Sequence, residues 1–286
     1  MIFSSVKQHH NIWPVRLQCK VLEVSASGYY AWLKRPPSKR AVANQNLLGD
    51  IRRIHWNSHK RYGSPRVHAA LRAEGHRVSR RRVEKLMRRN DLQAITKCRV
   101  RITTTDSRHN LPVAPNVLDR NFGALLPNEK WLADITYIFT AEGWLYLAAV
   151  LDLYSRKIVG WAMRDHMRTE LPLAALTMAI QRQHPQPGLI HHSDRGSQYA
   201  SGDYQNVVAS SGMTPSMSRK GNCWDNAPME SFFHTLKTEL VHHRIYTTKE
   251  EAKRDLFQYI EGFYNRHRIH SAINYLTPDQ MEQKAA

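Results

Sequence analysis

Cysteine is scarce in this chain of 286 residues, and long apolar runs are missing. The three cysteines, Cys19, Cys98 and Cys223, are widely spaced and form no CxxC pair. This argues against a disulfide framework or a zinc finger and fits a reducing compartment. The longest apolar run, residues 144–151, is far too short to span a bilayer, and the N-terminus lacks the apolar core of a secretory signal. We therefore expect an intracellular protein that does not bind membranes.

Acidic residues are scarce in the first two fifths of the chain. Residues 1–110 contain 24 Lys and Arg against 6 Asp and Glu, whereas residues 111–286 contain 18 of each. The whole net charge of +18 therefore lies in the front part. One interpretation is a solvated basic surface. The interpretation that we favour is a front part that binds a polyanion, joined to a near-neutral body.

The front part has the periodicity of short helices. Helices are predicted over residues 12–33, 42–58, 64–75 and 80–90, with a Pro-rich basic linker at 34–40. Ser64 and Ser79 are the expected N-caps, and Gly75 is the expected stop between the last two helices. Two short helices joined by a turn with Gly, the second densely basic, are typical of a helix-turn-helix. The alternative is a helical bundle with a basic face. The expected DNA contacts are Arg80, Arg81, Arg82, Lys85, Arg88 and Arg89.

The back part alternates differently. Strands are predicted over residues 130–140, 144–154, 157–165, 188–192 and 213–218, and helices over 173–184, 201–211 and 225–240, the last capped by Asp225. Three antiparallel strands followed by alternating helix and strand predict an α/β domain with a mixed five-stranded sheet. We divide the chain into an N-terminal helical region (1–40), a helix-turn-helix domain (41–105), a linker (106–127) and a core with a C-terminal helix (128–286).

Three carboxylates stand at informative places in this back part. Asp134 lies inside the first strand, where a buried acid is costly unless it is paired or bound to metal. Asp194 directly follows the fourth strand, and Glu230 lies near the start of the helix 225–240. Without a His or Cys ligand set, such carboxylates suit Mg²⁺ or Mn²⁺, and two such ions clamp the phosphodiester in nucleases. Lys237 lies two turns after Glu230 on the same face, either as a DNA contact or as a surface ion pair.

Other polar residues in the back part have simpler interpretations. His191 and His192 alternate across a strand, and a metal role is the less favoured one for both. Asp152 ends a strand and is expected to be a turn residue. Arg266 and Arg268 in "YNRHRIH" are expected either to contact phosphate or to pack the C-terminal segment onto the core.

The residues around the carboxylates resemble a known family. Asp194 and Glu230 are separated by 35 residues, and Lys237 follows seven residues later, which is similar to the DDE triad of retroviral integrases and bacterial transposases. The chain resembles OrfB-type transposases of the insertion-sequence-three group over roughly residues 15–280. The resemblance is carried by "RYGSPRVHAALRAEGHRVSRRRVEKLMRRNDL", "NEKWLADITYI", "GWLYLAAVLDLYSRKIVGWAM", "IHHSDRGSQY", "MSRKGNCWDNAPMESFFHTLKTE" and "YNRHRIHSAINYLTP".

The resemblance implies a ribonuclease-H-like core with Asp134, Asp194 and Glu230 as ligands of two Mg²⁺ or Mn²⁺ ions, and Lys237 near DNA. It implies nicking at the ends of an insertion sequence and transfer of the freed 3′-hydroxyl to another strand, by a homo-oligomer bound to double-stranded DNA in the bacterial cytoplasm. It also implies an upstream-frame protein as partner, alone or as a frameshift fusion.

Two other functions stay open from the residues. The first is a sequence-specific DNA-binding protein or repressor whose core has lost activity, which the complete carboxylate set disfavours. The second is a ribonuclease-H-like nuclease without strand transfer. The basic helix-turn-helix disfavours that function, because such a nuclease needs no sequence reader.

Overall fold

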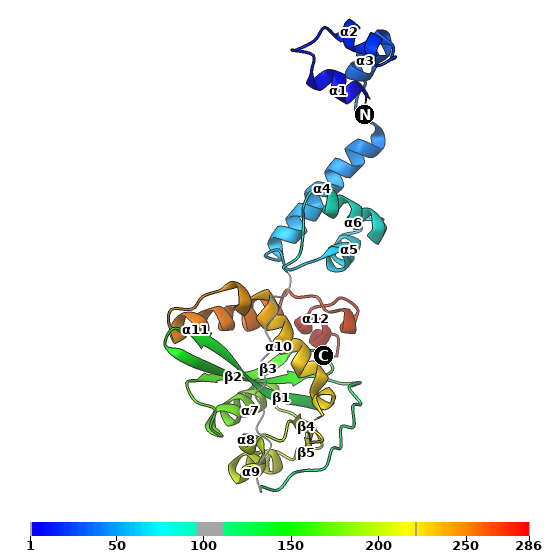
Figure 1. Ribbon diagram of the computed structural model, residues 1–286. Coiled ribbons are helices and arrows are strands. Elements are labelled where there is room, and N and C mark those ends of the chain that lie inside the picture. The colour runs from blue at the N-terminus through cyan, green and yellow to red at the C-terminus, as the bar shows by residue number, and fades with distance from the viewer. Residues whose placement is uncertain (1, 96–110, 221, 286) are drawn as a thin grey trace.

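The computed structural model describes residues 2–95, 111–220 and 222–285. Figure 1 shows three parts in succession: a small helical cluster at the N-terminal end, a second helical group built around the long helix α4, and a larger domain that contains the sheet. The boundary expected near residue 105 lies outside the described residues.

The N-terminal cluster has three helices, whereas the sequence predicted a single helical unit. Its helices are α1 (Ile2–Gln8), α2 (Val15–Val21) and α3 (Ala26–Lys34). The last two fall within the predicted helical unit, whereas α1 was not predicted. Phe3 of α1 packs against Tyr29 and Trp32 of α3, with ring centroids 6.1 and 5.9 Å apart. This aromatic contact holds α1 in place.

The second group confirms the predicted helices of the front part. It consists of α4 (Lys39–Asn57), α5 (Ser64–Ala73) and α6 (Arg80–Arg89). The Ser79 hydroxyl caps α6 by accepting from the Arg82 amide, and Gly75 turns the chain after α5 with a φ of 90°, a conformation that favours glycine. Ser64 is the first residue of α5, and its N-cap is Gly63, one residue before the predicted cap.

The sheet has the predicted five strands. They are β1 (Lys130–Thr140), β2 (Gly143–Asp152), β3 (Ile158–Arg164), β4 (Ile190–Ser193) and β5 (Thr214–Met217), in the order β3-β2-β1-β4-β5. β1, β2 and β3 pair antiparallel, whereas β4 is parallel to β1 and β5 is parallel to β4. The pairing between β1 and β4 is short and reaches only Leu132. Beyond this residue, β1 and β4 diverge.

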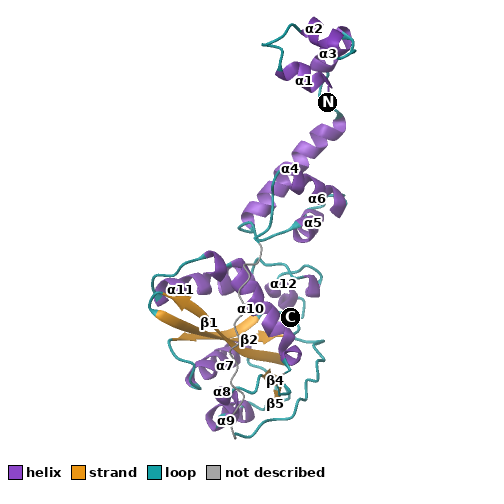
Figure 2. Ribbon diagram, viewed as in Figure 1, coloured by secondary structure: helices purple, strands orange, loops and turns teal. Residues whose placement is uncertain are grey.

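Helices cover both faces of the sheet, as Figure 2 shows. One face packs against α7 (Glu170–Gln183), α8 (Ser197–Ala200) and α9 (Gly202–Ser210). The other face packs against α10 (Ala227–Glu239), α11 (Lys249–Phe257) and the π-helical segment Gln258–Tyr264. The chain continues to α12 (Pro278–Gln283), and short 3-10 turns lie at Cys223–Asn226, Val241–His243 and Ser271–Ile273. No helix in the described part of the chain is long and apolar enough to cross a membrane.

A glycine allows α7 to approach the sheet closely. A Cβ atom at Gly160 of β3 would meet the Ala175 carbonyl oxygen and would lie 2.7 Å from the Ala179 amide nitrogen of α7. We expect Gly160→Ala to lower the free energy of unfolding by about 1–3 kcal/mol or more, because backbone atoms must move. Urea unfolding measures this change. The control is Gly49→Ala in α4, where nothing lies within 4 Å of the added atom and helix propensity favours alanine by about 1 kcal/mol. Equal stability of the two variants would contradict the close packing.

Candidate active site

Asp134 lies in the part of β1 that no longer pairs with β4. The residue is opposite Ala149 of β2 and lies two positions beyond the last pairing with β4. Its carboxylate accepts a hydrogen bond from the Ile135 amide at 2.8 Å. Asn226, just before α10, donates to the Ala133 carbonyl oxygen at 3.3 Å and so brings the start of α10 to this part of β1.

Asp194 follows β4 and is held by a tight turn. Its Oδ1 atom accepts from the Gly196 amide at 2.9 Å. A Cβ atom at Gly196 would lie 3.0 Å from the same oxygen, so a side chain there would crowd the carboxylate. The opening of β1 from β4 and this turn together direct Asp194 to the region that Asp134 faces.

Glu230 completes the carboxylate set from the first turn of α10. Burial raises the pKa of Asp134 well above its usual range, and the nearby charges of Asp194 and Glu230 raise it further. Burial also raises the pKa of Glu230. Asp194 acts on Asp134 more strongly than Glu230 does, so the two aspartates are the more strongly interacting pair. The structure thus brings the three predicted carboxylates together.

Lys237 extends from α10 to the same place. Its charge lowers the pKa of Asp134, and burial lowers the pKa of Lys237 itself, against the effect of Asp134. The Lys237 Nζ atom lies 4.6 Å from the centroid of the Tyr137 ring, a cation–π contact. Sequence analysis did not single out Tyr137, because nothing in a strand sequence indicates that a helix residue a hundred positions later covers its ring.

The donors at this site fit a hard divalent cation in their chemistry. All three are carboxylates, and a cation between Asp134 and Asp194 would relieve the repulsion that raises the pKa of Asp134. As they stand, no three Asp, Glu, His or Cys side chains among the described residues are arranged to enclose a metal ion. Asp134 and Asp194 would hold an ion first, with Glu230 as the third donor.

Neighbouring polar residues have structural partners. His191 hydrogen-bonds the Tyr204 hydroxyl, and His192 contacts the Ser216 and Ser218 hydroxyls. Burial lowers the pKa of His191 to about 3 and that of His192 to about 4. Their buried hydrogen bonds give both imidazoles a structural role.

Asp152 and Asp225 differ in how well the sequence predicted them. Asp152 accepts from the amides of Asn128 and Ser155, at 3.0 and 2.8 Å, which confirms it as a turn residue. The prediction that Asp225 caps the helix was wrong. Its buried carboxylate instead binds Arg219 and Arg120, each at 2.8 Å, and these cations hold its pKa far below the usual range. Asp225 thereby fixes the segment that leads into α10.

The last residue of α10 belongs to a buried polar cluster. Glu239 accepts from Arg268 at 2.8 Å and from the Tyr259 hydroxyl at 2.8 Å. Arg268 is 5% exposed, and its guanidinium faces Glu239. Of the two roles expected for Arg268, the structure favours packing, and we do not retain it as a DNA contact. Arg266 is exposed.

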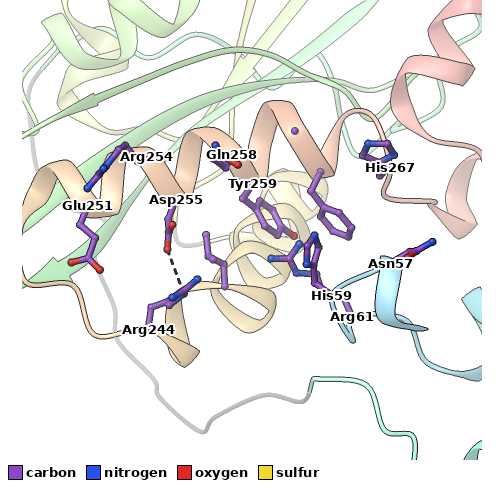
Figure 3. A pocket seen from close by; sticks show the side chains of 13 residues that line it. Asn57, His59, Arg61, Arg244, Glu251, Arg254, Asp255, Gln258, Tyr259 and His267 are labelled. Carbon is purple, nitrogen blue, oxygen red and sulfur yellow. Dashed lines mark ion pairs between the residues drawn. The ribbon is translucent and has the colours of Figure 1, made fainter. Parts of the chain in front are cut away.

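The helix-turn-helix group is joined to this cluster directly. The Tyr62 hydroxyl, in the loop between α4 and α5, donates to the His267 carbonyl oxygen at 2.7 Å and accepts from the Ile269 amide at 3.0 Å. The Arg61 guanidinium lies 4.3 Å from the Phe263 ring centroid. Figure 3 shows Arg61 and Tyr259 in the adjoining cavity of about 800 Å³. The two motifs "RYGSPR" and "YNRHRIH" therefore contact each other.

The basic helix α6 presents its cations to solvent. Val83, Leu86 and Met87 are buried against the rest of the helical group. Arg82 is half-buried and donates to the Asn44 side chain at 2.9 Å, so it differs from the other five predicted contacts. Arg88 pairs with Glu84 at 2.6 Å. The exposed cations are Arg80, Arg81, Lys85, Arg88 and Arg89.

Known protein families match both the front helical group and the sheet domain of the chain. The integrase core domain family matches residues 124–223, a second integrase core domain family matches residues 230–285, and the HTH-like domain family matches residues 43–100. Among solved structures, the chain is similar to the simian T-cell lymphotropic virus intasome in complex with PP2A regulatory subunit B56 gamma. That likeness has 16% identity and a TM-score of 0.48, and it covers 81% of this chain and 74% of the other.

Relatives match along nearly the whole length. The chain is 46% identical over 266 residues to the insertion element IS600 uncharacterized 31 kDa protein of Shigella sonnei, covering 93% of this chain and 97% of that protein. It is 40% identical over 287 residues to the transposase InsF for insertion sequence IS3A of Escherichia coli (strain K12), covering 99% of each. Because it has an integrase core domain and an HTH-like domain and matches an IS3 transposase along its whole length, the chain belongs to the IS3 family of DNA transposases, enzymes that cut and join nucleic acid.

Proposed function

We propose that this transposase cuts the ends of an insertion sequence with a DDE-type site and joins the freed 3′-hydroxyl to another DNA strand. The observation that carries the proposal is that Asp194, Glu230 and Lys237, from separate segments, lie close enough to Asp134 for their charges to act on it. The raised pKa values of Asp134 and Glu230, beside the half-buried Lys237, indicate a site that a divalent cation and a phosphate would together neutralise.

The proposed division of labour follows from the chemistry of the side chains. Asp134, Asp194 and Glu230 would hold Mg²⁺ or Mn²⁺, two ions in the full site, and bound ions of this kind activate the attacking oxygen and neutralise the leaving one. Lys237 would orient the phosphate next to the scissile bond. A reaction of this kind needs no side-chain nucleophile and forms no covalent bond between the protein and the DNA.

The direct test uses labelled insertion-sequence end DNA, the full chain and Mg²⁺. We expect nicked ends and joined products, both lost when EDTA removes the metal. Binding without cutting would support a repressor, and cutting without joining would support a simple nuclease.

Because two ends must be brought to one target, we propose a homo-oligomer on double-stranded DNA in the bacterial cytoplasm. The upstream-frame protein, alone or fused, would be a further partner.

The exposed cations of α6 are proposed to contact DNA phosphates, as is Arg266. Together, Arg81→Ala and Lys85→Ala are expected to weaken binding of end DNA and to reduce the slope of log K against log salt by about 2, because each lost phosphate contact removes about 0.9. Fluorescence anisotropy at several salt concentrations measures both effects.

The matched control lies on the same helix. Arg82→Ala removes a cation that is already bound to Asn44, so it should change the salt slope by less than one. A double variant at Arg81 and Lys85 with the wild-type slope would show that α6 does not face the DNA.

A further inference from the structure

Four aromatic side chains share one face of the β1–β2 hairpin. Strand pairing places Tyr137 opposite Tyr146 and Phe139 opposite Trp144, and side chains directly opposite each other in a pair lie on the same face. The Trp144 ring contacts both residues of β1, with centroids 4.9 Å from Tyr137 and 5.2 Å from Phe139. We refer to Tyr137, Phe139, Trp144 and Tyr146 as the hairpin aromatic face.

This face is open to solvent at the end of the hairpin. Phe139 is 65% exposed and Trp144 is 43% exposed. Further along the same face, Ala148 and Val150 are buried in the apolar cluster that contains α7. The exposed rings therefore lie beyond the part of the face that the helices cover. Rings in mutual contact, unlike scattered apolar side chains, form a surface suited to a partner.

Cations stand at both sides of the hairpin aromatic face. Lys237 lies over the Tyr137 ring, and Arg164 of β3 is exposed and paired in register with Tyr146. The acidic side chain at the tip, Glu142, accepts from the Lys249 amide at 2.8 Å. The face thus combines aromatic rings with positive charge, which is the composition of surfaces that bind unpaired nucleic acid.

Lys237 connects this face to the carboxylates. Asp134 and Tyr137 are three residues apart on β1, so their side chains point to opposite faces of the sheet. Lys237 nevertheless interacts with both. It can do so only across the edge of β1 that β4 leaves open beyond Leu132. A strand that passes from the carboxylates over this edge arrives at the aromatic rings.

We propose that the hairpin aromatic face is a binding site for unpaired bases of the DNA strand next to the scissile phosphate, which stack on Trp144 and Phe139 while Lys237 and Arg164 contact the backbone. The inference rests on the proposed function for its location beside the cut. Stacking on aromatic side chains tolerates any base sequence, so the site would hold an opened end without reading it.

The test compares two end duplexes that differ only in whether the bases next to the cut are paired. Binding is measured by anisotropy in EDTA, so that it is independent of catalysis. We expect the wild-type protein to bind the unpaired end more tightly, and the double variant with Phe139→Ala and Trp144→Ala to bind that end about 10-fold more weakly, on the order expected for loss of base stacking. Its binding of the paired end should stay the same. A 2-aminopurine base at the unpaired position should be quenched by the wild-type protein only.

Two controls keep the result decisive. Trp13→Ala removes another exposed tryptophan, 57% exposed, in the loop between α1 and α2, and should keep the preference for the unpaired end. Phe139→Ala alone, at a largely exposed position, should lower the preference for the unpaired end with no loss of folding.

Equal binding of both ends by the wild-type protein, or an unchanged preference in the double variant, would overturn the inference. So would a change in oligomeric state with the preference kept, because the face would then bind a second copy. If the wild-type protein prefers the unpaired end but does not cut in Mg²⁺, the proposed function fails and the binding site stands.

Discussion

Each of Asp134→Asn, Asp194→Asn and Glu230→Gln is expected to abolish cleavage and joining of end DNA while leaving end binding largely intact. Neutral amides are poor donors to Mg²⁺, and since even outer partners of metal ligands are worth about 10- to 100-fold in activity, we expect losses of at least about 100-fold for the ligands themselves. Gel analysis of labelled ends with Mg²⁺ resolves nicked from joined products.

The stability of these variants separates a functional loss from misfolding. Partial burial raises the pKa of Asp134, and the charges of Asp194 and Glu230 raise it further. Asp134→Asn removes this repulsion, so its thermal stability should equal or exceed that of the wild type. Asp203→Asn, an exposed aspartate in the first turn of α9, is the control and should keep full activity. Normal cutting by any one triad variant would remove that residue from the site.

The largest loss of stability is expected for Glu239→Ala. The change leaves Arg268, which is 5% exposed, without the carboxylate that now binds it. Removing one partner of a buried ion pair costs about 3–5 kcal/mol because the other charge stays desolvated. Urea unfolding should show a loss of this order. The same change should weaken the contacts of Arg66 and Tyr62 with the C-terminal segment.

An exposed ion pair provides the comparison for this prediction. Arg244 and Asp255 form an ion pair, drawn as a dashed line in Figure 3. The two charged atoms lie 3.4 Å apart, and the Arg244 side chain is 58% exposed. Arg244→Ala should therefore change the free energy of unfolding by less than about 1 kcal/mol. If Glu239→Ala were as mild, water or another group would have to satisfy Arg268, and the cluster would not hold the two parts of the chain together.

Local patterns predicted the elements of the core well. The alternation in residues 130–165 identified three strands to within a few residues, because each strand buries apolar side chains against helices on one or both faces. The end of α5 was predictable from Gly75, whose backbone conformation favours glycine. Helix α1 was missed because its seven residues are too few to show a helical periodicity.

The site was predictable only in part, because the residues that interact in it lie far apart in the sequence. Asp134, Asp194 and Glu230 were identified from an unexplained acid in a strand and from family resemblance, not from any local sign that they meet. Asp225 seemed to be a helix cap because Arg120, one of its partners, lies about a hundred residues earlier. The side-chain partners of Glu239 are equally distant in the sequence, because Arg268 comes from the C-terminal segment and Arg66 from α5. Arginines that neutralise a buried acid cannot be told from those that bind phosphate until the fold brings them together.

The hydrogen bonds of Tyr62 to His267 and Ile269 fix the position of the helix-turn-helix group relative to the C-terminal segment. The same C-terminal segment also binds Glu239 at the end of α10. The distance between the basic helix α6 and the three carboxylates is therefore held by contacts within the fold. On a DNA held by both parts, one added base pair would displace the target phosphate by about 3.4 Å and rotate it by roughly a tenth of a turn. In the proposed reaction, the spacing between the DNA that α6 contacts and the bond that is cut would therefore be set by Tyr62 and by the buried polar cluster around Glu239.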